Sequence, residues 1–122
     1  MEQAEPPHRI GFGGQSLVVE LRNRDHLVEV SSRVPDNDRA GGESLNKVLD
    51  RALDSSFLQL RNLDSDGDTI FSRLQMRDVI PELDRLRDFA RSDVEKRTIE
   101  KILGLAKRCQ AQSDSYLVFL GD

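Results

Sequence analysis

The segment SYLVFL at residues 115–120 constrains the fold more than any other stretch, because it is apolar on both faces of a strand. Successive side chains of a strand point to opposite sides. A strand that is buried on one side therefore shows alternating apolar and polar residues. A strand covered on both sides is usually central in its sheet. We therefore expect the C-terminal segment to be inserted between other strands.

Other strands are predicted by alternation and by turn residues. In SLVVELRNRDHLVEVSS, residues 16–32, two alternating runs flank Arg22-Asn23-Arg24-Asp25, which indicates a β-hairpin. FLQLRNL, residues 57–63, reads as a further strand. TIFSRLQ, residues 69–75, begins with β-favouring residues and is expected to be a strand, although an approach to a helix is the alternative.

Three segments have helical spacing of apolar residues. The first is predicted around residues 45–53, on the stripe Leu45, Val48, Leu49, Ala52 and Leu53. The second should begin near Asp78, which places Pro81 in the first turn, and bury Val79, Ile80, Leu83, Leu86 and Phe89. The third starts at the capping-box sequence Ser92-Asp93-Val94-Glu95 and buries Ile99, Ile102, Leu103, Ala106 and Cys109.

Together these segments predict an α+β fold with the order β-β-α-β-(β)-α-α-β. The sheet is expected to be mixed or antiparallel, with the helices on one face and the C-terminal strand in the centre. Residues 1–8 are predicted to be a flexible lead-in, and residues 9–122 a single domain. The run of charges and turn formers from Arg33 to Ser44 is expected to be a long surface loop. Gly104, inside a helix, suggests close approach of another backbone.

The stretch DSDGDTIFSRLQ, residues 64–75, has carboxylates at Asp64, Asp66 and Asp68, a spacing similar to that of calcium-binding EF-hand loops. Position 6 of the loop is threonine where an EF-hand has glycine, and position 12 is Gln75 where a bidentate glutamate is required. Asp-Gly is also a strong hairpin signal. We therefore expect Asp66-Gly67 to be the tip of a hairpin joining residues 57–63 to 69–75, with no metal site.

The residues that most often carry catalysis are few. His8 lies in the lead-in and His26 at a hairpin edge, and nothing in the sequence brings them together. Cys109 lies on an apolar helical stripe, where a thiol behaves as a small hydrophobe. No catalytic, cofactor-binding or metal-binding residues are assigned on this basis, and an enzyme is the less favoured reading.

The formal charge of −4 and isoelectric point near 5.2 make nucleic acid an improbable partner. No window has the roughly 18 apolar residues of a membrane span, and MEQAEPPHRI lacks the features of a signal peptide. The excess of arginine over lysine fits a GC-rich bacterial gene. We expect a soluble cytoplasmic bacterial protein that binds another protein without catalysis, in the manner of an immunity protein, antitoxin or regulator.

Two other functions stay open at this point. One is a small enzyme or ligand-binding domain with a cleft beside the sheet, for which a pocket containing His26 and acids would be the sign. The other is a weak calcium-binding domain that uses the acidic turn at residues 64–68. The sequence does not identify the partner or ligand, the oligomeric state or the role of the loop at residues 33–44.

Overall fold

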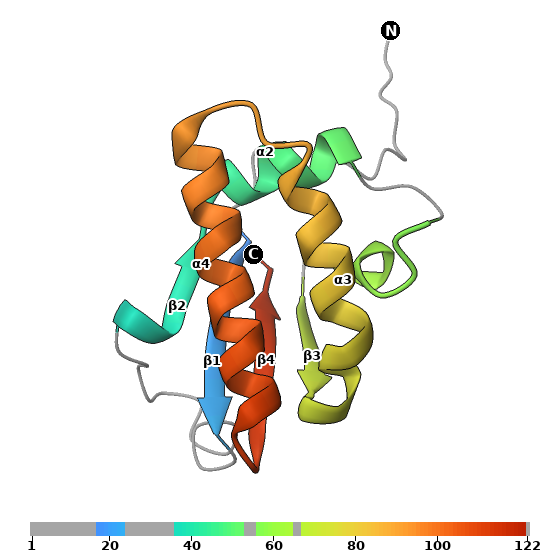
Figure 1. The fold of residues 1–122 in the computed structure, drawn as a ribbon, viewed down its shortest axis with the longest axis vertical. Helices are drawn as coiled ribbons and strands as arrows, with labels where there is room; N and C mark the ends of the chain where they lie inside the picture. The colour runs from blue at the N-terminus through green and yellow to red at the C-terminus, as the bar shows by residue number, and fades with distance from the viewer. Residues whose placement is uncertain (1–16, 24–35, 53–55, 65–66, 122) are drawn as a thin grey trace, which may run out of the picture.

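The structure is a computed structural model that describes residues 17–23, 36–52, 56–64 and 67–121 (Figure 1). Its strands and helices are, in chain order, β1 (Val18–Asn23), β2 (Arg39–Gly41), α2 (Glu43–Ala52), β3 (Asp68–Ser72), α3 (Met76–Arg87), α4 (Asp93–Ala111) and β4 (Ser115–Leu120). Short 3-10 turns occur at Asp36–Asp38, Leu60–Asn62 and Arg73–Gln75. The predicted α+β class and the approximate element order are confirmed.

The four strands form one antiparallel sheet in the order β2-β1-β4-β3. β4 lies between β1 and β3, so the prediction that the C-terminal segment is an internal strand is confirmed. β1 pairs with β4 along its whole length, and with β2 only from Val18 to Glu20. β2 and β3 are therefore the two edges of the sheet formed by the described residues.

The core lies between the sheet and one layer of helices, with α3 and α4 lying along the sheet and α2 crossing near one end (Figure 1). Alternate residues of β1 enter this core, namely Leu17 just before the strand, Val19 and Leu21. Phe119 of β4 packs edge-to-face on Phe71 of β3, with ring centroids 5.6 Å apart. None of the helices within the described ranges has the length and hydrophobicity needed to cross a membrane.

The apolar stripes of the three helices are buried largely as predicted. Val79, Leu83 and Leu86 of α3 are fully buried, and so is every predicted stripe residue of α4. Ile80 is only partly buried, and Phe89 lies beyond the end of α3 with 39% of its surface exposed. Phe89 was therefore wrongly placed on the buried face. Leu53, the last predicted residue of the first stripe, lies outside the described residues.

The prediction of a loop from Arg33 to Ser44 is wrong from Asp36 onward, and residues 33–35 lie outside the described residues. Residues 36–44 contain a 3-10 turn, β2 and the start of α2. β2 was missed because it is a three-residue edge strand whose position depends on a glycine. Gly41 has φ +120°, and a Cβ there would lie 2.6 Å from the Leu17 carbonyl oxygen, so only glycine can bring the chain this close to β1.

The predicted strand at residues 57–63 is also wrong, since this segment is a turn followed by the 3-10 helix Leu60–Asn62. Phe57, Leu60 and Leu63 are buried, whereas Leu58 is 56% exposed, so the apolar residues follow the three-residue period of a 3-10 helix. The hairpin expected with Asp66-Gly67 at its tip is therefore absent, and β3 pairs with β4. The strand prediction for TIFSRLQ holds only as far as Ser72.

The start of α3 differs from the prediction as well. The helix begins at Met76, not near Asp78, after the turn Arg73–Gln75. Ser72 and Gln75 form a capping box ahead of that turn, and the Ser72 N–H donates to Gln75 Oε1 over 2.8 Å. Pro81 lies inside the helix, five residues after its start, on the exposed side, where its missing N–H leaves the Arg77 carbonyl without a helical partner.

The remaining local predictions have mixed outcomes. α4 begins after Ser92, whose Oγ accepts from the Glu95 N–H over 3.1 Å, as the capping box predicted. β1 confirms the first strand of the predicted hairpin, and its second strand, near residues 27–30, lies outside the described residues, as do residues 1–8. Gly104 is exposed, and outside its own helical turn no atom of the described residues would lie within 4 Å of a Cβ at this position, so the suggested close backbone contact is wrong.

Candidate interaction surface

Three buried glutamates are the first places to look for chemistry, because carboxylates that lose water need partners. They are Glu20 on β1, Glu82 on α3 and Glu95 on α4. None was predicted as a buried group. In each case the partners show whether the carboxylate serves the fold or is left available for a ligand.

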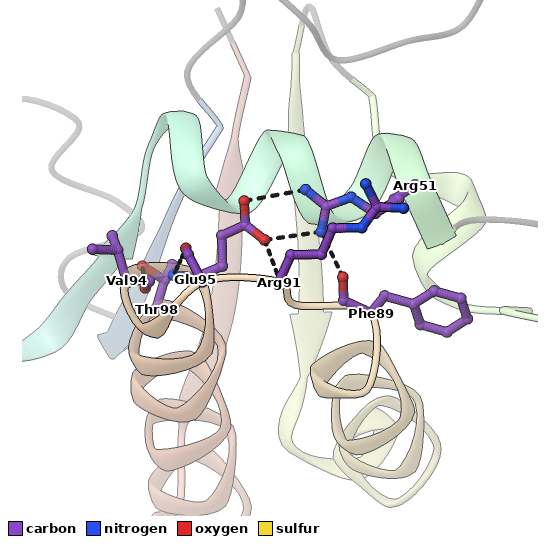
Figure 2. Close-up of polar contacts among 7 residues, drawn as sticks. Arg51, Phe89, Arg91, Val94, Glu95 and Thr98 are labelled. Carbon is purple, nitrogen blue, oxygen red and sulfur yellow. Dashed lines mark hydrogen bonds and ion pairs between the residues drawn. The ribbon is translucent and has the colours of Figure 1, made fainter.

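Glu95 lies where α2 passes the turn between α3 and α4 (Figure 2). Its carboxylate accepts from Arg51 Nη1 at 2.8 Å, from Arg51 Nη2 at 3.1 Å and from the Arg91 N–H at 2.8 Å. Arg51 also donates to the Phe89 carbonyl oxygen. The hydrogen bonds from Arg51 and Arg91 lower the pKa of Glu95 from 4.5 to about 2. The group therefore acts as a charged clamp between α2 and the α3–α4 turn.

Glu82 holds the irregular segment that was predicted to be a strand. Both of its carboxylate oxygens lie within 3.0 Å of the Gln59 N–H, and Oε1 also accepts from the Leu60 N–H at 2.9 Å. These N–H groups open the 3-10 turn Leu60–Asn62 and would otherwise be orphan donors. Arg85, one residue before Leu86 on α3, stacks on the Phe57 ring at 4.3 Å and donates to the Ser56 carbonyl oxygen.

Glu20 lies on the sheet face that is turned away from the helices. It accepts from Arg22 Nε at 2.7 Å, and Arg39 Nε approaches its Oε2 at 3.4 Å without the alignment of a hydrogen bond. Its neighbours in register are Arg39 on β2 and Val118 on β4. Flanked on both sides, Glu20 retains only 5% exposure, so its carboxylate is committed to the two arginines.

The sequence could have revealed only one of these three. Glu82 lies three residues after Val79 and four before Leu86, so it falls on the buried face of the helix, and this spacing is a usable signal. Glu95 was noticed only as a capping residue, and its partner Arg51 is 44 residues away. Glu20 follows the polar alternation of a half-exposed strand, which hides its burial.

The residues considered earlier for chemistry are not brought together. Cys109 is buried in the core, where burial raises the pKa of its thiol to about 11. His8, His26 and Asp66 lie outside the described residues. Asp64 and Asp68 are exposed, and the Asp64 N–H donates to Thr69 Oγ1. Within the described ranges, no three histidine, cysteine or acidic residues are grouped in a way that could hold a metal ion.

A hollow of about 380 Å³ lies at the β2 edge of the sheet, lined by Val18, Arg39, Ala40, Gly41 and Lys101. Its described lining offers two cations and backbone groups, with neither a carboxylate nor a histidine. A second hollow beside the sheet, of about 210 Å³, includes Asp38, whose carboxylate is paired with Arg108 at 2.7 Å.

The opposite edge has a different character. β3 pairs with β4 on one side only, and within the described part of the chain no strand covers its other side. Ile70, in the middle of this edge strand, is 51% exposed, whereas Val118 beside it in register is 2% exposed. Leu74, just beyond the strand, is 77% exposed. We call residues 68–72, with the side chain of Ile70, the β3 edge.

Edge strands usually carry protection such as lysine, proline or a bulge, because their unpaired backbone groups recruit other strands. The β3 edge has a single charge, Asp68 at its start, followed by Thr69, Ile70, Phe71 and Ser72. β2 is shorter, with three residues, and carries Arg39. Of the two edges, β3 is the one whose length and composition suit the addition of a strand.

Comparison with protein-family models, with curated proteins and with solved structures found no match to this chain. Its function is therefore argued from the geometry above.

Proposed function

We propose that this chain is a small cytoplasmic bacterial protein that binds another protein without catalysing a reaction, and that it does so at the β3 edge. The observation that carries the proposal is an exposed isoleucine in the middle of an unprotected edge strand. An apolar side chain beside unpaired backbone donors and acceptors offers a partner both hydrophobic contact and main-chain hydrogen bonds.

The buried carboxylates also favour a function without catalysis. The carboxylates of Glu82 and Glu95 accept hydrogen bonds that fasten one element to another, and the carboxylate of Glu20 is held by Arg22 of its own strand and by Arg39 of β2. Cys109 has a raised pKa and lies in the core, so its thiol is poorly suited to nucleophilic chemistry. A role as an immunity protein, antitoxin or regulator would need only a specific protein surface.

The test compares two substitutions of equally exposed apolar residues. The immobilised chain is exposed to cytoplasmic extract of its native organism, and the retained protein is purified and titrated calorimetrically against the chain. Ile70→Lys should abolish a one-to-one complex, because it places a charge and a bulky side chain at the edge. Leu58→Lys, at a residue 56% exposed on the 57–63 segment, should leave it intact.

Equal binding by both variants would place the contact elsewhere on the molecule. Failure to retain any stoichiometric protein, together with turnover of a small metabolite by the pure chain, would favour the enzyme or ligand-binding alternative. The calcium alternative has its own measurement, since heat on titration with millimolar calcium, lost in Asp68→Asn, would support an ion site at residues 64–68.

A further inference from the structure

We infer that the partner binds by adding an extended segment antiparallel to β3, with an apolar residue opposite Ile70 and a lysine or arginine two residues later, opposite Asp68. This inference rests on the proposed function and specifies its mode and the chemistry of the partner. Three observations support it: which residues of β3 hydrogen-bond to β4, the capping of Ser72, and the side chains along the edge.

The phase of the ladder shows which backbone groups face outward. The Gly121 N–H donates to the Gly67 carbonyl oxygen over 2.8 Å, and these two residues continue the β3–β4 register by one step. Hydrogen-bonded and non-bonded pairs alternate along an antiparallel ladder. Thr69 and Phe71 are therefore bonded to β4, and the N–H and C=O groups of Asp68, Ile70 and Ser72 point away from it.

The capping of Ser72 agrees with this phase and limits the edge. The Ser72 N–H is held by Gln75 Oε1, which is possible only because that N–H points away from β4. Among the described residues, the outward groups left at the β3 edge are thus the N–H and C=O of Asp68 and of Ile70, because the carbonyl of Ser72, as the N-cap, accepts the first bond of the turn Arg73–Gln75. A segment of about five residues satisfies them, with its central residue exchanging two hydrogen bonds with Ile70.

The side chains set the sequence preference of that segment. Asp68 and Ile70 are two residues apart, so their side chains lie on the same face of the sheet, and both are exposed. In an antiparallel partner the residue opposite Asp68 comes two positions after the residue opposite Ile70. Opposite charges across a strand pair are favourable, and the chain carries a net charge of −4, so a basic residue fits there.

A second copy of this chain fits the same edge less well. Symmetric antiparallel pairing about Ile70 would place Asp68 of each copy opposite Ser72 of the other. Serine supplies no positive charge, and its N–H is already held by Gln75, so a donor would be missing at both ends of the pairing. The edge is therefore better matched to a different protein that supplies a cation.

The experiment uses an end-capped nine-residue peptide of threonine, with valine at positions three and five and lysine at position seven. Binding to the whole chain is followed by amide chemical shifts. We expect saturable binding with the largest shifts at Asp68 and Ile70. Methylating the nitrogen of the central valine should weaken binding about tenfold, because that N–H donates to Ile70. Methylating the next threonine, whose N–H points outward, is the matched control and should change binding less than about twofold.

Protein variants give a second measurement. Ile70→Pro removes an outward N–H without touching the β3–β4 ladder and should weaken peptide binding about tenfold, whereas Ile70→Val should bind normally. The reversed peptide, with lysine before the central valine, should bind more weakly than the original. Should Ile70→Pro fail to fold, the methylated peptides decide the question alone.

Three results would overturn the inference. They are equal binding of the two methylated peptides, absence of saturable binding to the wild type, and a wild-type dimer in sedimentation that Ile70→Pro dissociates. These outcomes are distinct from failure of the proposed function. If Ile70→Lys no longer bound a native partner protein but Ile70→Pro still did, the protein-binding function would be supported and strand addition would be excluded as its mode.

Discussion

Replacing Glu95 by glutamine tests the interpretation of the clamp between α2 and the α3–α4 turn. The substitution keeps the shape of the side chain and removes its charge, so two charge-assisted hydrogen bonds from Arg51 are lost or weakened. A pKa of about 2 in place of 4.5 corresponds to about 3 kcal/mol of folding stability near neutral pH. Because Arg51 is 22% exposed and partly screened by solvent, we expect a loss of about 2 to 3 kcal/mol.

The lowered pKa also predicts how the stability lost in Glu95→Gln changes with pH. The pKa of Glu95 is lowered in the folded protein, so its contribution is complete above the ordinary value of 4.5 and disappears as the pH falls toward 2. Urea unfolding of the wild type and of Glu95→Gln should therefore differ by a constant free energy from pH 6 to 8. That difference should shrink steadily between pH 4.5 and 2.

Glu100→Gln is the matched control, since Glu100 is an exposed residue of the same helix and should change stability by less than about 0.5 kcal/mol. The double variant with Arg51→Gln should show that the two losses are not additive, because both remove the same pair. A difference between wild type and Glu95→Gln that stayed constant down to pH 2, or that was under about 0.5 kcal/mol at pH 7, would refute the electrostatic reasoning.

Three further predictions concern the fold. Glu82→Ala should lower the free energy of unfolding in urea by about 2 to 4 kcal/mol, because the two N–H groups of Gln59 and Leu60 lose their acceptor. Hydrogen exchange of these two amides should become faster, and unchanged exchange would contradict the prediction. The Cys109 thiol, whose pKa is raised to about 11 by burial, should react with a disulfide reagent at pH 8 only after urea unfolds the chain. Rapid labelling of the folded protein would show that α4 is not packed as described. Gly104→Ala should raise stability by up to about 1 kcal/mol, since outside its own helical turn a methyl group there would meet no atom of the described residues. A loss of stability in thermal unfolding would contradict this.

Local patterns were sufficient to find the three helices and most of their buried stripes, and to place the central strand, although the start of α3 and the burial of Phe89 were predicted wrongly. The stripe of α4 and its Ser92 cap are properties of neighbouring residues, so periodicity and capping chemistry identify them directly. β4 could be placed inside the sheet because its apolar residues occur on both faces, a pattern typical of internal strands. In these segments the local preference of the residues for a helix or a strand agrees with the structure that they adopt in the folded protein.

The two wrongly predicted segments, residues 57–63 and the strand β2, depend on a partner far along the chain. Residues 57–63 have enough apolar residues for a strand, and the Glu82 carboxylate decides otherwise by binding the N–H groups that open the 3-10 turn. β2 exists only because Gly41 can approach Leu17 closely. Neither contact leaves a mark in the local sequence, because each joins residues more than 20 positions apart.

The sequence by itself determined the fold class, the three amphipathic helices and the central position of the C-terminal strand, because these follow from the spacing of apolar residues. Tertiary structure alone decided the burial of Glu20 and Glu95 and which edge of the sheet stays open. Glu20 and Glu95 are paired with Arg39 and Arg51, which the fold brings to them from other elements. The openness of β3 depends on β4 having neighbours on both sides while β3 has one among the described strands. Charge pairing and strand adjacency are set by distances in space, which the order of residues does not record.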